Sequence, residues 1–402
     1  MASHSKIDFA LPELLEQQPD FSALPAAQQP GWEDDPKLPD IRRKLAGRAP
    51  LVDPNHTALL RLIMADVAAG RMQIIQAGDC AEDPAEHTPR QLHRKVSLLH
   101  SLAGVMQTNT RRPVLCVGRI AGQFAKPRSR PTERIGDLEL PAFRGVLVNS
   151  PEPTPGARRP DPRRLLAGHH AAATIMNFLN GDPGWEPAPR LWTSHEALVL
   201  DYEVPQLRRT EDGGLTLTST HWPWVGERTR QPDGAHVALL AAVRNPVAAK
   251  VGPDSTEDAL LELCGRLDPD REPGRLTLIS RMGPAIGQVL PGLVTAVRRA
   301  GHPVSWLCDP MHGNTVQAPC SRKTRYVDAL LREVGAFQRI VTDRGGVAAG
   351  LHLETTPDQV TECVTSDADV DRVGDNYTTL CDPRLNPQQA LSVAAAWSAG
   401  AR

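Results

Sequence analysis

Eight short apolar runs recur along the chain, and each ends in polar or charged residues. Segments with helical spacing follow most of them, at 88–107, 256–267, 285–300 and 323–338. Strand and helix repeated about eight times predict an α/β fold whose parallel sheet closes into a (β/α)8 TIM barrel. An open doubly wound sheet stays an alternative, because the sequence does not show closure. The runs are 72–77, 114–118, 196–202, 222–226, 246–251, 276–280, 303–308 and 349–353.

Segments outside this rhythm are expected to extend one barrel domain. Residues 1–70 predict an N-terminal extension, an arm with short helices, and 71–402 predict the barrel. The stretch 17–39 is rich in Pro, Gln and Asp, which is typical of an extended strap. Residues 151–190 are rich in Pro, Arg and Gly. We therefore expect a loop insertion there, with one helix over 163–179, and not a linker between domains.

The composition excludes several classes of protein. A net charge of −2 and a pI near 6.7 imply no broad basic face, so neither nucleic acid nor a membrane surface is expected as a partner. No apolar run reaches the ~18 residues that span a membrane, and residues 1–15 are polar and carry acids, unlike a signal peptide. Seven widely spaced cysteines without a CxxC pair are typical of a reducing cytosol, so a cytoplasmic location is expected.

Cations gather at the ends of the apolar runs. Like charges at one barrel mouth repel each other unless a polyanionic ligand lies among them, so a substrate bearing carboxylate and phosphate is indicated. Arginine also binds both groups bidentately. Surface ion pairs are the ordinary alternative, but Lys250 lies inside an apolar run, where an unpaired ammonium is costly. The six cations are Arg119, Lys126, Arg128, Arg228, Lys250 and Arg281.

A second group of strand-end residues carries a thiol, an imidazole and two carboxylates. Together these side chains predict a site for a divalent transition metal, and ligand softness favours Zn2+. Such a metal is a Lewis acid for a carbonyl oxygen. Each residue alone also has an ordinary interpretation, as a small buried hydrophobe, a loop hydrogen-bond partner, a neighbour of a helix cap or a turn former. The four are Cys80, His312, Glu354 and Asp382.

Ten motifs in a fixed order resemble the type II 3-deoxy-D-arabino-heptulosonate 7-phosphate (DAHP) synthases, from about residue 40 to the C-terminus. The resemblance implies a (β/α)8 barrel that condenses phosphoenolpyruvate with D-erythrose 4-phosphate and releases phosphate. The product is the first intermediate of the shikimate pathway to chorismate and the aromatic amino acids. The motifs are QAGDCAE (76–82), GRIAGQFAKPRS (118–129), SHEALVLDYE (194–203), WVGERTRQPDGAH (224–236), NPVAAKVGP (245–253), RLTLISRMG (275–283), WLCDPMHGNT (306–315), GLHLE (350–354), VTEC (360–363) and CDPRLNPQQAL (381–391).

The resemblance also implies a role for each motif residue. The metal in the family is Mn2+ or Co2+, with Zn2+ and Cd2+ as alternatives here, and its ligands fall on Cys80, His312, Glu354 and Asp382. The phosphoenolpyruvate ligands fall on Arg119, Glu227, Arg228, Lys250 and Arg281, and the aldose-phosphate ligands on Arg128 and Ser129. The expected catalytic residues are Lys126, Cys80 and His312, with Lys126 or a water molecule at the metal as proton donor. A homodimer or homotetramer is implied as well.

Two departures from the family pattern and two rival functions stay open. Ala77 stands where a glycine is expected, beside the metal-binding turn. Segment 145–195 is short, whereas long type II enzymes carry extra helices there that help to bind aromatic effectors. The chain therefore resembles the shorter, phenazine-type branch of secondary metabolism, and feedback inhibition is in doubt. One rival is an aminoDAHP-type synthase with an imino-erythrose phosphate acceptor, which the sequence does not distinguish. The other is a non-catalytic regulatory barrel, and the intact ligand and cation sets argue against this second rival.

Overall fold

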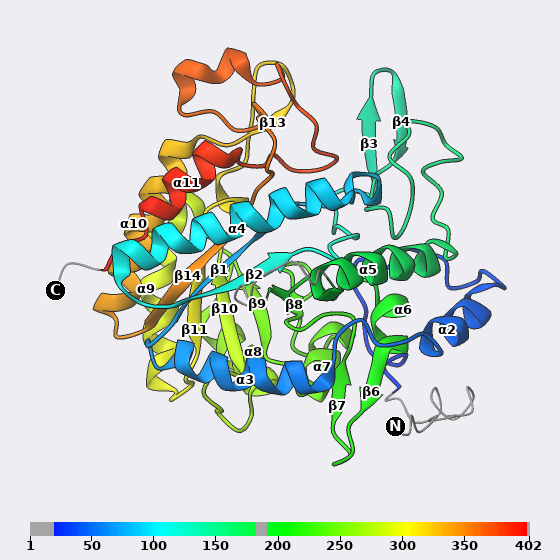
Figure 1. The fold of residues 1–402 in the computed structure, drawn as a ribbon, viewed down its shortest axis with the longest axis horizontal. Helices are drawn as coiled ribbons and strands as arrows, with labels where there is room; N and C mark the ends of the chain where they lie inside the picture. The colour runs from blue at the N-terminus through cyan, green and yellow to red at the C-terminus, as the bar shows by residue number, and fades with distance from the viewer. Residues whose placement is uncertain (1–19, 182–190, 400–402) are drawn as a thin grey trace.

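The computed structural model describes residues 20–181 and 191–399, which form a parallel barrel surrounded by helices (Figure 1). The sheet order is β5-β2-β1-β14-β11-β10-β9-β8. At the two outermost strands, a parallel bridge pairs Glu196, just after β5, with Trp224 of β8, and the Trp222 N–H donates to the Thr193 carbonyl of β5 (3.1 Å). The barrel is therefore closed, and the open-sheet alternative is wrong. The strands are β1 Gln73–Gly78, β2 Val114–Arg119, β5 Trp192–Thr193, β8 Trp224–Val225, β9 Val247–Val251, β10 Leu276–Ser280, β11 Ser305–Cys308 and β14 Val347–Glu354.

The third predicted strand is misplaced. The run 196–202 pairs at a single bridge, and the strand β5 lies upstream of it, at Trp192–Thr193. Residues Leu200–Glu203 form the short helix α6 instead. Leu198 and Val199 are buried against the N-terminal extension and the insertion after β4, outside the strand ladder. Their apolar character reflects this burial, and a short apolar run alone does not distinguish it from a strand.

Helices that follow the strands cover the outside of the barrel. They are α4 Pro89–Thr110, α7 Ala235–Ala242, α8 Glu257–Leu267, α9 Ile286–Arg299, α10 Val327–Asp343 and α11 Pro387–Ala395. The hydroxyl oxygens of Thr88 and Thr256 cap α4 and α8 by accepting from backbone N–H groups. The predicted helix 323–338 begins too early. Lys323–Thr324 forms β13, which pairs with β12 (Val316–Gln317) in a hairpin, so α10 begins only after it.

The N-terminal extension closes one end of the barrel. It contains α2 (Leu38–Ala46) and α3 (Pro54–Ala68). Leu60 and Met64 of α3 are fully buried among interior residues of several strands. Gly274, just before β10, lies so close that a Cβ there would come 2.4 Å from an α3 backbone nitrogen. Helix α3 therefore covers the amino-terminal ends of the strands, and the carboxyl-terminal ends stay open.

Insertions surround the open end. Strands β3 (Thr132–Ile135) and β4 (Leu138–Pro141) form a hairpin that stands beside it (Figure 1). Helix α5 covers Arg164–Gly181, as the prediction of 163–179 indicates, and residues 182–190 of the predicted insertion lie outside the described residues. In the described part of the chain, every helix is too short or too polar to cross a bilayer. The remaining elements are β6 Leu207–Arg209, β7 Leu215–Leu217 and 3-10 turns at Pro84–Glu86, Val204–Gln206, Gly283–Ala285, His312–Asn314 and Asp367–Arg372.

Candidate active site

A cavity of about 800 Å³ opens at the carboxyl-terminal ends of the strands. Nine of the twelve predicted site residues line it, namely Lys126, Arg128, Ser129, Glu227, Arg228, Lys250, Arg281, His312 and Asp382. The other three, Cys80, Arg119 and Glu354, lie beneath its wall and are at most 2% exposed. All twelve therefore gather at one end of the barrel, as expected for strand-end residues. We call the residues around Glu354 the floor (Cys80, Arg119, Lys126, His312, Arg325, Glu354 and Asp382) and the outer cations the mouth (Arg128, Arg228 and Arg281).

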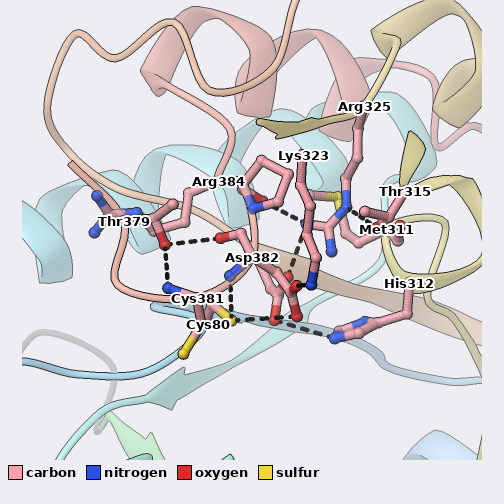
Figure 2. A network of polar contacts seen from close by, with 12 residues as sticks. Cys80, Met311, His312, Thr315, Lys323, Arg325, Thr379, Cys381, Asp382 and Arg384 are labelled. Atoms are coloured by element: carbon pink, nitrogen blue, oxygen red, sulfur yellow. Dashed lines mark hydrogen bonds and ion pairs between the residues drawn. The ribbon is translucent and has the colours of Figure 1, made fainter. Parts of the chain in front are cut away.

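The four predicted metal ligands converge at the floor. Figure 2 shows Cys80 and His312 on either side of Asp382, and the three side chains point toward one another. Ligand atoms of Cys80, Glu354 and Asp382 lie within 4.8 Å of one another. The Cys80 Sγ is 3.7 Å from Asp382 Oδ2, and His312 Nε2 is 3.1 Å from Glu354 Oε1. This set of thiol, imidazole and carboxylate donors fits a divalent transition metal.

Asp309 determines how His312 faces this group. The Nδ1 atom of His312 is 2.8 Å from Asp309 Oδ2, which leaves Nε2 directed at Glu354. Lys250 Nζ donates to the same Asp309 oxygen at 2.9 Å. Burial raises the pKa of Asp309, but His312 and Lys250 lower it more, so that the pKa lies well below its usual value. A carboxylate behind a histidine is a common supporting feature of metal sites.

The Lys126 ammonium lies among three of the predicted ligands. Its Nζ is 2.7 Å from Cys80 Sγ, 3.1 Å from Glu354 Oε1 and 3.0 Å from Asp382 Oδ2. Burial lowers the pKa of Lys126, but these partners raise it well above its usual value, so the amine carries a proton. For the Cys80 thiol, burial acts in the other direction and raises the pKa well above its usual value. A divalent cation reverses that preference, because a coordinating thiol loses its proton.

Glu354 binds cations on both of its oxygens. Oε1 accepts from Arg119 Nη2 at 3.2 Å and from Lys126 Nζ at 3.1 Å, and Oε2 accepts from Arg325 Nη1 at 2.7 Å. Burial raises the pKa of Glu354, yet His312, Lys126 and Arg325 together hold it well below its usual value. The carboxylate is therefore ionised although it is fully buried. Removing the Glu354 carboxylate would leave these buried cations without their shared partner, which is strongly destabilising.

Protein groups hold Arg119 beneath the cavity wall. Its Nε donates to the Asp79 carbonyl at 3.1 Å, and its Nη1 is 2.6 Å from His352 Nε2. The guanidinium also stacks over Trp224, 5.4 Å from the ring centre. Among the five predicted phosphoenolpyruvate ligands, Arg119 is thus the one that the structure does not place on the wall.

The mouth carries cations that are less compensated. Arg128 donates to Glu133 on β3 at 2.6 Å. Arg228 is exposed, and neither Arg228 nor Arg281 has a carboxylate partner among residues 20–181 and 191–399. Arg281 Nη2 donates to the His312 carbonyl at 3.3 Å. Guanidinium groups arranged in this way are suited to bind phosphate or carboxylate of a ligand.

Glu196 is a cavity residue that the sequence interpretation missed. It lines the wall, its Oε1 is buried without a hydrogen-bond partner in the described part of the chain, and burial raises its pKa. Gly226 makes room for it, since a Cβ at that position would lie 2.1 Å from Oε1. Glu227 nearby also has a buried oxygen without such a partner. The apolar run 196–202 predicts a strand and gives Glu196 no role, although an acid at the start of an apolar run is a usable signal.

Three further site residues were assigned no role from the sequence. Asp309 lies in the predicted strand-end motif that supplies His312, so its position was visible but its pairing was not. The helical spacing of 323–338 predicts that Lys323 and Arg325 begin a helix, whereas both reach the floor (Figure 2). Lys323 Nζ donates to Asp382 Oδ1 at 2.7 Å. No local pattern predicts such contacts, because they join segments that are far apart in the sequence.

Ala77 causes little change where the family pattern has glycine. It is 4% exposed and pairs with Leu353 and Gly118 inside the barrel ladder. The residue that lies against the neighbouring backbone is the next one, Gly78. Gly78 has a φ of +151°, and a Cβ there would lie 2.5 Å from the Arg119 carbonyl oxygen. Position 78 therefore requires glycine, while position 77 accepts alanine.

Comparison with known proteins places the chain in a family. The class-II DAHP synthetase family matches residues 16–183 and 187–398. A probable phospho-2-dehydro-3-deoxyheptonate aldolase of Pseudomonas fluorescens is 55% identical over 383 residues, which cover 93% of this chain and 95% of the relative. Phospho-2-dehydro-3-deoxyheptonate aldolases of Streptomyces coelicolor and Mycolicibacterium smegmatis are 39% and 36% identical, over 92% and 95% of this chain and 94% of each relative. The chain belongs to the class-II DAHP synthetase family.

Proposed function

We propose that this protein is a DAHP synthase, which condenses phosphoenolpyruvate with D-erythrose 4-phosphate, releases phosphate and forms 3-deoxy-D-arabino-heptulosonate 7-phosphate. One observation carries the proposal: a group of metal-binding donors and guanidinium groups without carboxylate partners share one cavity. Two phosphorylated substrates, one with a carbonyl group, match that combination. Family membership supports the same reaction, the first step of the shikimate pathway.

The cations divide between the two substrates. Arg228, Lys250 and Arg281 bind the phosphate of phosphoenolpyruvate, and Arg119 with Lys126 orients its carboxylate, with Glu227 beside them. Support comes from the mouth, where Arg228 and Arg281 have no carboxylate partner among the described residues. Arg119 acts mainly through its fixed charge, because it lies beneath the wall. Arg128 and Ser129 bind the phosphate of the aldose.

The floor holds a divalent metal. Its ligands are Cys80, His312, Glu354 and Asp382, and the metal is Mn2+ or Co2+, with Zn2+ and Cd2+ as alternatives. When bound, the metal supplies a Lewis acid for the carbonyl oxygen of the aldose. The chain itself contributes orientation, since Asp309 directs His312 Nε2 towards the other ligands.

Side chains of the cavity move the protons. C3 of phosphoenolpyruvate bonds to the aldehyde carbon, and the aldehyde oxygen takes a proton from Lys126 Nζ. A water oxygen then bonds to C2, and the Glu196 carboxylate accepts the proton that the water loses. The bond from C2 to the phosphate oxygen breaks, and phosphate leaves with the bonding electrons and the remaining water proton as C2 becomes a ketone. The proton on Glu196 replaces the one that Lys126 gave, so atoms and charges balance.

A phosphate-release assay with both substrates, combined with mass spectrometry of the product, tests this proposal. We expect the mass of DAHP, loss of activity on chelation, recovery with Mn2+ or Co2+, and loss of activity in Cys80→Ala. The matched control is Cys264→Ala, because Cys264 is also fully buried but lies on α8. Activity that survives both chelation and Cys80→Ala would contradict the metal assignment.

The same assay separates the rival functions. Turnover with imino-erythrose phosphate but not with erythrose 4-phosphate would identify an aminoDAHP-type synthase. A thermal shift with phosphoenolpyruvate, without phosphate release from any acceptor, would indicate a non-catalytic regulatory barrel. The buried cation and ligand groups of the floor argue against that second outcome, because a site without a function would not retain such costly charges.

We also propose that the chain belongs to the shorter, secondary-metabolism branch and lacks feedback inhibition. Alignments with the Streptomyces and Mycolicibacterium relatives run over 423 and 440 positions, more than the 402 residues of this chain, so both relatives contain segments that it lacks. Adding phenylalanine, tyrosine or tryptophan should therefore leave the rate unchanged. A homodimer or homotetramer in the cytoplasm is the matching proposal for assembly and location, which light scattering and cell fractionation would check.

A further inference from the structure

Two loops of the cavity carry residues with different roles. The loop after β10 carries Arg281, and the loop after β11 carries His312. Their backbones touch: a Cβ on Gly283 would lie 2.3 Å from the Gly313 carbonyl oxygen, and a Cβ on Gly313 would lie 2.4 Å from Gly283 N. Arg281 Nη2 also donates to the His312 carbonyl at 3.3 Å. A shift of one loop must therefore move the other.

One side chain joins both loops from below. Glu333 lies on the inner face of α10, where its neighbours along the helix, such as Leu330 and Phe337, are buried and apolar, and it is 4% exposed. Its Oε1 accepts from Met282 N–H at 3.1 Å and from Gly283 N–H at 2.9 Å. Its Oε2 accepts from the Asn314 side-chain amide. One carboxylate thus binds the Arg281 loop with one oxygen and the His312 loop with the other.

The electrostatic setting of Glu333 is unfavourable for an ionised group. It has no cation partner among the described residues, and the titratable groups that act on it are Asp309 and Cys308, both at the end of β11. Burial and then Asp309 raise the pKa of Glu333 to about 7, against the N–H donors that lower it. Burying an apolar residue on this helix face would cost less free energy than burying a carboxylate. The carboxylate therefore holds the two loops and does not contribute to the packing of α10.

We propose that Glu333 is a positioning residue that fixes the Arg281 loop to the His312 loop, so that the phosphoenolpyruvate site and the metal site are held in register and bind their ligands cooperatively. The inference rests on the proposed function, because it uses Arg281 as a substrate ligand and His312 as a metal ligand. It adds to that function a coupling between the phosphoenolpyruvate site and the metal site. Such coupling is typically 5- to 150-fold in affinity.

A glutamine at position 333 distinguishes the two halves of this contact. Its carbonyl oxygen can still accept from Met282 and Gly283, but its amide would face the Asn314 amide, donor against donor. Glu333→Gln therefore releases the His312 loop while keeping the Arg281 loop in place. Asn314→Ala breaks the same contact from the other side and keeps the carboxylate, so it serves as a second variant if the first folds poorly.

The experiment measures phosphoenolpyruvate affinity by calorimetry with and without Mn2+ at pH 8. In the wild type we expect Mn2+ to tighten phosphoenolpyruvate binding at least fivefold, and in Glu333→Gln and Asn314→Ala we expect that ratio to fall close to one. Glu262→Gln on α8 is the matched control, because it makes the same change at an exposed position and should keep the wild-type ratio. A loss of thermal stability alone would not change this ratio.

The pH dependence gives a second measurement. Glu333 accepts with both oxygens when ionised, and protonation on passing below its pKa of about 7 removes one acceptor. The wild-type ratio should therefore shrink from pH 8 to pH 6, while the ratio in Glu333→Gln should stay flat.

Several outcomes would overturn the inference. A folded Glu333→Gln with the wild-type ratio at pH 8, or a wild type that binds both ligands without coupling, contradicts it and leaves the proposed function intact. A wild type that neither binds phosphoenolpyruvate nor forms DAHP contradicts the proposed function, and the inference fails with it.

Discussion

The floor and the mouth of the cavity differ in how their charges are balanced. At the floor, Arg119, Lys126 and Arg325 each lie within 3.2 Å of a Glu354 oxygen. At the mouth, Arg228 and Arg281 have no carboxylate partner in the described part of the chain. Removing one member of a buried ion pair leaves an uncompensated charge and destabilises the fold, whereas cations without a carboxylate partner are available to bind an anionic ligand. Changes at the floor should therefore affect folding and turnover together, and changes at the mouth should affect substrate affinity alone.

Glu354→Gln should give the largest effect. The substitution removes a predicted metal ligand and leaves three buried cations without their shared carboxylate. We expect kcat to fall about 1000-fold or more, because a metal contributes several kcal/mol and each 1.4 kcal/mol is tenfold. Melting temperature should fall as well. A variant that keeps both its melting temperature and its Mn2+ affinity would show that the floor does not act as one unit.

Asp79→Asn tests the support beneath the floor. Asp79 lies 2.6 Å from Lys95 and 2.8 Å from Arg384. Burial raises the pKa of Asp79, but the two cations lower it by more, so that the pKa lies below its usual value. We expect Asp79→Asn to cost about 3–5 kcal/mol in the free energy of unfolding at pH 7, measured by urea titration.

The sign of its pH dependence follows from the lowered pKa. The stabilisation by Asp79 is fully present above the unfolded pKa of about 4 and is lost as the pH falls through the folded value. The difference between wild type and variant should therefore shrink on acidification below about pH 4. A difference that grows in acid would contradict the lowered pKa.

Glu196→Gln changes a residue of the cavity wall that belongs to neither the floor nor the mouth. It keeps size and burial but removes the carboxylate that we propose accepts the proton of the attacking water. General base catalysis is worth about 100-fold or more, so kcat should fall by about that factor while KM for both substrates changes little. An unchanged kcat, with pre-steady-state phosphate release at the wild-type rate, would exclude Glu196 as the base.

Arg281→Met should give the smallest of these effects and one confined to binding. It removes a mouth guanidinium but keeps an apolar side chain of similar length. A charge-assisted hydrogen bond is worth about 1.5–3 kcal/mol, so KM for phosphoenolpyruvate should rise about 10- to 100-fold. KM for erythrose 4-phosphate and the melting temperature should stay near wild type. A large fall in melting temperature would remove the contrast between mouth and floor.

Much of the fold follows from local pattern. Seven of the eight apolar runs overlap their strands, and the helix prediction of 163–179 overlaps α5. The failure at 196–202 has a physical cause, since burial under the extension produces the same apolar run as burial in a ladder. The early start predicted for α10 has another cause: Lys323–Thr324 has a pairing partner in β12, and that hydrogen bonding decides its conformation.

The sequence by itself determined the alternation of strand and helix, the placement of twelve site residues at strand ends and, by resemblance, the family. Tertiary structure alone decided which charges pair, and it placed Glu196 on the cavity wall and Glu333 between two loops. The reason is distance along the chain: Lys126 meets Asp382 at 3.0 Å across 256 positions, and Arg384 meets Asp79 across 305. Periodicity reports burial and local hydrogen bonding, whereas charge compensation depends on contacts that exist only in the closed barrel.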